Sequence, residues 1–224
     1  MSFDAVIFDL DGTLLDSLED IATAANEVLV GLGRTAHPLS DYRYLVGDGV
    51  AMLFQRALSE SSDSTLIAEC VQRFDTAYSK CWHNRSKPYD GIEQMLEVLN
   101  ERSIVLSVLS NKPAAFTKVC VEYFFGNAKF AQVMGHSEHF PRKPDPSSAK
   151  WIAAQVGVCS DRIAYVGDTN TDMKTAVGAG QCAIGVTWGF RPESELVACG
   201  AQRICSTVHE LTNYLLGSQP NCNN

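Results

Sequence analysis

The chain has 224 residues and a formal net charge of −8, from 26 Asp and Glu against 18 Lys and Arg. This balance argues against a protein that binds nucleic acid or an anionic membrane, because either partner requires a basic face. With 46% hydrophobic and 20% charged residues, the disordered, collagen-like and coiled-coil classes are excluded. No apolar run approaches the roughly 20 residues that cross a bilayer, so we expect a soluble, cytoplasmic protein.

Short apolar runs predict six strands, the last of them at an edge of the sheet. The runs are continuous rather than alternating, which is typical of a parallel sheet covered on both faces. In chain order they span residues 5–8, 104–109, 131–134, 163–166, 182–186 and 203–205.

Helix-length segments alternate with these runs. The alternation predicts an α/β fold with a doubly wound, Rossmann-like parallel sheet. The predicted helices span residues 92–101, 114–125, 146–156, 172–177 and 208–216.

Residues 16–85 depart from this alternation of strands and helices, because they show helical patterns and no convincing strand. The strand at 5–8 cannot bury its own edges, so it must join the later sheet. We therefore expect residues 1–15 and 86–224 to form an α/β core and residues 16–85 to form an inserted, all-helical subdomain. Apolar residues recur at helical spacing over 17–33, 50–58 and 66–82.

The eight cysteines form no Cys-x-x-Cys pair, and most lie within apolar runs. This placement predicts buried thiols that pack as small hydrophobic side chains, rather than disulfides or metal ligands.

The first predicted strand ends in Phe8-Asp9-Leu10-Asp11-Gly12-Thr13. Side chains two positions apart point the same way on extended backbone, and paired carboxylates at the end of a buried strand are costly without a cation. The pair suits a Mg²⁺ site in which one carboxylate is a nucleophile and the other transfers protons. Gly12 and Thr13 allow a tight turn whose amides can meet a phosphate. The alternative is a solvated, Asp-rich turn.

Two later segments offer ligands for a phosphate. Ser110 and Asn111 follow the second predicted strand, where a hydroxyl and an amide can donate to phosphate oxygens, although either could instead cap the next helix. Lys143 lies in the loop before another helix and could neutralise charge on the nucleophile and the phosphate. A lone lysine is, however, usually a solvated surface residue.

Asp168 and Asp172 follow the strand at 163–166, with Asp172 in the first turn of the next helix. Both offer oxygen ligands to a hard cation, although Asp172 could equally serve the helix N-terminus. Ligands of open α/β sheets bind beyond the carboxyl ends of the strands. We therefore expect these side chains to converge: Asp9, Asp11, Ser110, Lys143, Asp168 and Asp172.

The ordered motifs resemble those of the haloacid dehalogenase superfamily, and the helical insert resembles that family's C1 cap. The resemblance implies that Asp9 forms an aspartyl-phosphate and that Asp11 acts first as general acid and then as base. Dehalogenases and phosphonatases of the family lack a carboxylate at the position of Asp11, so the presence of Asp11 favours a phosphomonoesterase. The matching motifs are Asp9-x-Asp11-Gly12-Thr13, Ser110, Lys143-Pro144 and Gly167-Asp168-x-x-x-Asp172.

The same resemblance implies how the ligands are held. Mg²⁺ would be bound by the Asp9 side chain, the Asp11 carbonyl and Asp168, with Asp172 in support. The phosphoryl group would be held by Ser110 and by Lys143.

Residues 42–49 of the insert place Gly47 and Gly49 before a helix. They permit close approach of the backbone to a ligand, or they form a plain turn. This segment and residues 185–189 resemble phosphoglycolate phosphatases, which makes phosphoglycolate the expected small-molecule substrate. The sequence leaves the oligomeric state open between a monomer and a homodimer. The alternatives are another capped enzyme of the superfamily (a sugar-phosphate or nucleotide phosphatase, a pyrophosphatase or a β-phosphoglucomutase) or a non-catalytic phosphoacceptor module.

Overall fold

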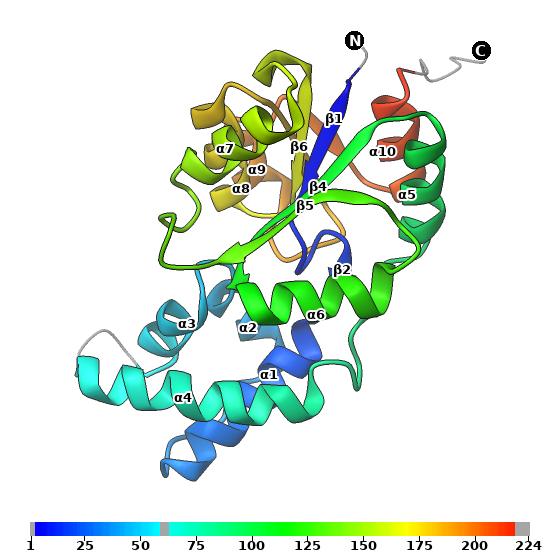
Figure 1. The fold of residues 1–224 in the computed structure, drawn as a ribbon. Helices are drawn as coiled ribbons and strands as arrows, with labels where there is room; N and C mark the ends of the chain where they lie inside the picture. The colour runs from blue at the N-terminus through cyan, green and yellow to red at the C-terminus, as the bar shows by residue number, and fades with distance from the viewer. Residues whose placement is uncertain (1–2, 59–62, 218–224) are drawn as a thin grey trace.

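The computed structural model describes residues 3–58 and 63–217, and a six-stranded parallel sheet lies at its centre (Figure 1). The strand order is β5-β4-β1-β6-β7-β8. The order reverses at β1, so the carboxyl end of β1 is the place where open α/β sheets bind ligands. The strands are β1 (Ala5–Phe8), β4 (Val105–Pro113), β5 (Phe130–His136), β6 (Ile163–Gly167), β7 (Cys182–Val186) and β8 (Arg203–Cys205).

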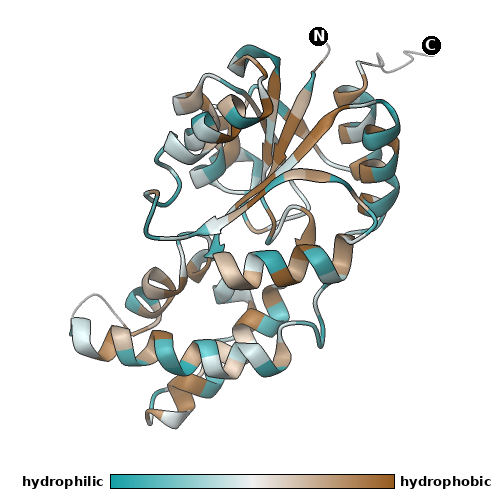
Figure 2. Cartoon of the chain, in the orientation of Figure 1, coloured by the Kyte–Doolittle hydropathy of each residue, from teal (hydrophilic) through white to brown (hydrophobic). Residues whose placement is uncertain are grey.

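Helices cover both faces of the sheet, which explains why the strand sequences are continuously apolar. On β1, Val6 and Phe8 pack with α5, α6 and α10, whereas Ala5 and Ile7 pack with α7, α8 and α9. Figure 2 shows the hydrophobic strands inside this sandwich. The helices are α5 (Ile92–Glu101), α6 (Ala114–Phe125), α7 (Ser147–Val156), α8 (Asn170–Ala179), α9 (Glu193–Ala198) and α10 (Val208–Leu215), with a 3₁₀ turn at Ser160–Arg162.

Four further helices lie beyond the carboxyl end of the sheet (Figure 1). Leu29, Phe54, Phe74 and Tyr78 belong to an apolar cluster that these helices share, and Phe190, which follows β7, joins it. The helices therefore have a core of their own that faces the sheet's ligand-binding edge. They are α1 (Leu18–Gly31), α2 (Leu39–Leu45), α3 (Val50–Ala57) and α4 (Ser64–Cys81).

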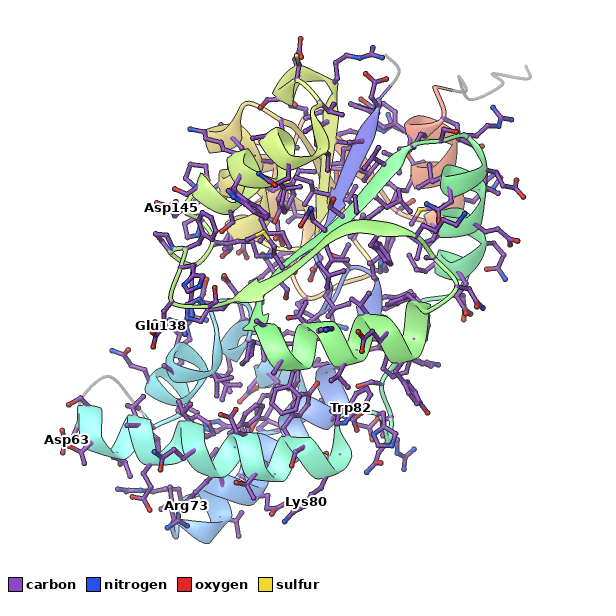
Figure 3. The ribbon with its side chains drawn as sticks, in the orientation of Figure 1. Asp63, Arg73, Lys80, Trp82, Glu138 and Asp145 are labelled. Atoms are coloured by element: carbon purple, nitrogen blue, oxygen red, sulfur yellow. The ribbon has the colours of Figure 1, made fainter. Side chains whose placement is uncertain are left out.

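The chain enters and leaves this helical segment at adjacent points. Strands β2 (Leu15–Asp16) and β3 (Lys87–Pro88) form a small antiparallel pair there. The buried carboxylate of Asp20 accepts hydrogen bonds from the backbone N–H and the hydroxyl of Ser86, at 2.8 and 2.7 Å. Trp82, labelled in Figure 3 at the end of α4, meets the ring of Tyr123 of α6 edge-on, with 5.3 Å between centroids.

The predicted sheet and its covering helices are confirmed, with some differences. Strand β4 continues to Pro113, so Ser110 and Asn111 lie in the end of the strand rather than after it, because β5 pairs with β4 as far as Pro113. Helices α2 and α9 were not predicted, since seven and six residues are too few to establish a helical period.

The described cysteines are all free thiols. Cys159 is exposed, which contradicts the prediction of burial at that position, because it lies in the turn before the 3₁₀ helix. Cys70, Cys120 and Cys205 are buried as expected, and Cys222 lies outside the described residues. Over 3–58 and 63–217, none of the helices combines the length and hydropathy that a membrane crossing needs.

Candidate active site

Three buried carboxylates meet at the carboxyl edge of the sheet. Oxygens of Asp9, Asp168 and Asp172 all lie within 4.8 Å of one another. Burial, followed by the charge of Asp172, raises the pKa of Asp9 to about 7. Burial likewise raises the pKa of Asp168 well above its usual value, with added repulsion from Asp172 and Asp9. The three carboxylates thus form a site in which a cation would relieve strong repulsion.

Asp168 is fixed in position from two sides. Its Oδ1 accepts from the hydroxyl of Thr13 at 2.9 Å, and its Oδ2 accepts from the backbone N–H of Phe190 at 2.8 Å. Gly12 has φ +86°, and a Cβ atom there would lie 2.3 Å from Asp168 Oδ2. A side chain at Gly189 would lie 2.4 Å from the same oxygen. Two glycines are therefore required for backbone to surround this carboxylate.

Asp172 is the N3 residue of α8. Its Oδ2 accepts from the backbone N–H and the hydroxyl of Thr169, at 3.1 and 2.6 Å, in a capping box. Its Oδ1 accepts from Lys143 Nζ at 2.7 Å. Asp172 therefore caps the helix and also belongs to the cluster of three carboxylates, and its role toward a cation stays a prediction.

Lys143 is buried between the carboxylates. Its Nζ lies 2.8 Å from Asp9 Oδ1 and also donates to the carbonyl of Leu109 at 3.1 Å. Burial opposes its charge, but Asp172 and Asp9 outweigh that effect and raise the pKa of Lys143 well above its usual value. Asn111 holds the backbone of Lys143 by accepting from its N–H at 2.9 Å and donating to its carbonyl at 3.1 Å. The lysine is therefore a fixed cation and not a solvated surface residue.

Asp11 does not belong to the cluster of Asp9, Asp168 and Asp172. Its Oδ1 accepts from the hydroxyl of Ser17 at 2.6 Å, and both of its oxygens accept from Lys112 Nζ at 3.0 Å. Lys112 also donates to the hydroxyl of Tyr78 of α4 at 2.8 Å. The two acidic residues of the Asp9-x-Asp11 pair thus occupy different electrostatic surroundings, as two different roles would require.

A cavity of about 60 Å³ separates the sheet edge from the helical segment. Asp9, Asp11 and Ser110 line it from the sheet, whereas the helical segment contributes apolar side chains such as Leu53 and Phe74.

The loop that carries the paired glycines closes one side of the cavity. The carbonyl of Gly47 accepts from Asn111 Nδ2 at 3.0 Å, and Asp48 accepts from the hydroxyl of Thr171 at 2.9 Å. Gly49 has φ +90° and lines the cavity with Gly47. The loop is therefore attached to the sheet edge through residues that neighbour the cluster of three carboxylates.

These features match a known family. The model of the haloacid dehalogenase-like hydrolases matches residues 6–186, which span the strands from β1 to β7. The chain belongs to this family. Its fold and its class as a hydrolase follow from that membership.

Individual members of the haloacid dehalogenase-like hydrolases are similar over almost the whole chain. A phosphoglycolate phosphatase of Vibrio parahaemolyticus is 32% identical over 213 residues, covering 92% of this chain and 93% of that protein. Another, from Psychrobacter arcticus, is 28% identical and covers 96% of each chain. A crystal structure from Lactobacillus delbrueckii subsp. bulgaricus, 28% identical, has a TM-score of 0.92 and covers 97% of this chain and 100% of that one.

The sequence patterns of this haloacid dehalogenase-like hydrolase did not single out Lys112 or Tyr78. Lys112 stands beside Ser110 and Asn111, but a lysine at a strand end gives no sign that it is buried. Tyr78 is 34 residues away from Lys112, and its place in the helical pattern is that of an ordinary apolar residue of α4. The contact between them arises only when the helical segment folds back over the sheet edge.

Proposed function

We propose that this protein is a Mg²⁺-dependent phosphomonoesterase that hydrolyses a small phosphorylated metabolite through an aspartyl-phosphate on Asp9. The observation that carries the proposal is the buried cluster of Asp9, Asp168 and Asp172 around Lys143. Asp9 also lines the cavity between the sheet edge and the helical segment. Family membership supports it independently.

The donor set fits magnesium. Three carboxylates face a single lysine, and hard oxygen ligands are those that Mg²⁺ takes up in proteins. Asp9 and Asp168 would hold the ion together with the Asp11 carbonyl. Asp172, whose oxygens are engaged by Lys143 and Thr169, would support it by orienting Lys143. When bound, the ion would offset the negative charge of the phosphoryl oxygens and of Asp9.

In the first chemical step, a carboxylate oxygen of Asp9 attacks phosphorus while the bond from phosphorus to the ester oxygen breaks. Asp11 gives its proton to that departing oxygen, because an alkoxide leaves poorly without one. Lys143 and the Ser110 hydroxyl stabilise the negative charge on the transferring group. The backbone amides of Gly12 and Thr13 and the side-chain N–H groups of Asn111 donate to carbonyl oxygens in this structure. They would serve as further donors only after exchanging those bonds for the phosphoryl oxygens.

In the second step, Asp11 has become a carboxylate and removes a proton from water. The water oxygen attacks phosphorus and the bond to Asp9 breaks, which releases inorganic phosphate and restores both aspartates. Asp11 therefore acts once as acid and once as base in each turnover.

Phosphoglycolate is the substrate that we propose. Relatives with this name align over almost the entire chain, and a cavity of about 60 Å³ suits a small ester better than a nucleotide. We propose that residues 16–85 act as the cap and that Gly47 and Gly49 let its loop approach the substrate. We propose that the protein is cytoplasmic and is a monomer or a homodimer.

Phosphate release across a substrate panel, with and without Mg²⁺, tests the proposal. The panel contains phosphoglycolate, pyrophosphate, sugar phosphates and nucleoside monophosphates, and Asp9→Asn is the matched variant. We expect Mg²⁺-dependent hydrolysis with phosphoglycolate preferred and no turnover by Asp9→Asn. Activity retained by Asp9→Asn would refute the nucleophile, and a flat profile without hydrolysis would favour a mutase or a non-catalytic phosphoacceptor.

A further inference from the structure

Lys112 is a buried lysine with a complete set of partners. Its side chain is 5% exposed, and an ammonium group has three hydrogens to donate. Two of its hydrogen bonds go to the oxygens of Asp11, both at 3.0 Å, and the third goes to the hydroxyl of Tyr78 at 2.8 Å. The ammonium group is therefore held in one orientation by a residue of the sheet edge and a residue of the helical segment.

This arrangement leaves the two oxygens of Asp11 in different situations. Among the described residues, Oδ1 accepts from both Ser17 and Lys112, whereas Oδ2 accepts from Lys112 alone. Each carboxylate oxygen offers two acceptor positions, so Oδ2 has one position left. Asp11 lines the cavity, and Oδ2 is accordingly the atom that can carry the proton exchanged with a bound substrate.

Tyr78 is fixed from both sides of the cavity. Its ring stacks on Phe74 of α4, with 5.2 Å between centroids, and meets Phe116 of α6 edge-on at 5.1 Å. A cap that opened would withdraw the tyrosine hydroxyl and leave Lys112 with an unsatisfied N–H. The third hydrogen bond of Lys112 therefore exists only when the helical segment lies on the sheet edge.

Stability alone does not account for this ion pair. Lys112 is buried and Asp11 is partly buried. Desolvation of such charges offsets much of their attraction, and apolar side chains of similar size often give equal or better stability. Both members of the pair line the cavity, and Asp11 is the proposed general acid and base.

We propose that Lys112 and Tyr78 are positioning residues that orient Asp11 for proton transfer, and that Tyr78 makes this orientation depend on closure of the cap. The inference rests on the proposed function, since it assigns a task only if Asp11 exchanges protons with a phosphate ester. It assigns no direct contact with substrate to Lys112.

The test compares two esters in single-turnover experiments with Lys112→Met, Tyr78→Phe and the unmodified protein. One ester is an alkyl phosphate that the unmodified protein hydrolyses, and the other is p-nitrophenyl phosphate, whose leaving group departs without a proton. We expect Lys112→Met to slow cleavage of the alkyl ester about 10–100-fold, a part of the 10²–10⁴-fold that general acids contribute. Release of nitrophenol should slow less than about 3-fold, and KM should hardly change. Tyr78→Phe, which keeps the ring, should slow the alkyl ester about 3–10-fold by the same reasoning.

Two variants provide matched controls. Lys118→Met removes an exposed lysine of α6, and Tyr42→Phe removes a buried hydroxyl that donates to Asn26 within the helical segment. Both should cleave the two esters at the rates of the unmodified protein. Equal slowing of both esters by Lys112→Met, or an effect on KM alone, would overturn the proposal, and so would a Tyr78→Phe variant that behaves like Tyr42→Phe.

This outcome can be separated from failure of the proposed function. Asp9→Asn tests the nucleophile and should stop release of both leaving groups. The ratio of the two rates tests the positioning of Asp11. If Lys112→Met does not fold, the ratio measured with Tyr78→Phe decides the question.

Discussion

Gly12→Ala should damage the protein far more than the addition of one methyl group suggests. The backbone at Gly12 has φ +86°, and a left-handed conformation costs a residue with a side chain about 1–2 kcal/mol. The new Cβ atom would also lie 2.3 Å from Asp168 Oδ2, so the carboxylate must move. Asp168 would then lose its hydrogen bonds from Thr13 and Phe190, each worth about 1.5–3 kcal/mol to a charged acceptor. We expect a total loss of about 4–8 kcal/mol.

Gly157→Ala is the matched control. Gly157 has φ +69°, and nothing lies within 4 Å of the position that a Cβ atom would occupy. This variant should lose only the backbone contribution of about 1–2 kcal/mol. Equilibrium urea unfolding, with and without Mg²⁺, measures both, and Mg²⁺ should raise the unfolding midpoint of Gly157→Ala but not of Gly12→Ala. Losses that agree within about 1 kcal/mol, too small for the two displaced hydrogen bonds, would refute the steric argument.

Three further predictions concern buried charges. Lys143→Met should abolish phosphate release and lower the free energy of unfolding by about 3–5 kcal/mol, because it leaves buried carboxylates without their cation; a loss of activity without a loss of stability would contradict this. Burial raises the pKa of Asp9 from 3.8 to about 7, so the metal-free folded protein retains a proton that the unfolded chain releases, and its stability should fall as the pH rises from about 4 to 7. Mg²⁺ should therefore raise Tm more at pH 8 than at pH 5, and equal increases by calorimetry would exclude this linkage. Asp20→Ala should destabilise by about 2–4 kcal/mol, because Ser86 loses its acceptor, whereas Glu19→Ala at the exposed neighbouring position should change the urea midpoint hardly at all.

The centre of the sheet could be predicted from the sequence because β1, β6 and β7 are short runs of apolar residues that are buried almost throughout. Cys182–Val186, for example, has the same bounds in the prediction and in the structure. Helix α2 could not be predicted, since only Tyr42 is buried in its seven residues and no repeat is visible. The predicted end of β4, at residue 109, was wrong. Ser110 and Asn111 are polar, but their backbone continues the strand.

The candidate site divides in the same way. Residues that directly follow a strand, such as Asp9 and Asp168, were identifiable because parallel strands carry their last residues to a common edge. The residue pattern alone left Lys143 open as a solvated surface residue, since its loop has no fixed geometry in the sequence, and the resemblance to a family favoured the role beside the phosphoryl group. The hydrogen bond between Lys112 and Tyr78 depends on how the helical segment packs on the sheet edge, which local sequence patterns do not encode.

The small β2–β3 ribbon has a consequence for how such molecules diversify. Leu15 pairs with Pro88 and Asp16 with Lys87, so the ends of the intervening helical segment lie side by side, as in a module inserted at a single point. A foreign segment of different length could be grafted at that point without altering the register of any strand in the main sheet. Exchange of this helical segment would change which molecules reach Asp9, Asp168 and Asp172 and would leave those three residues unchanged.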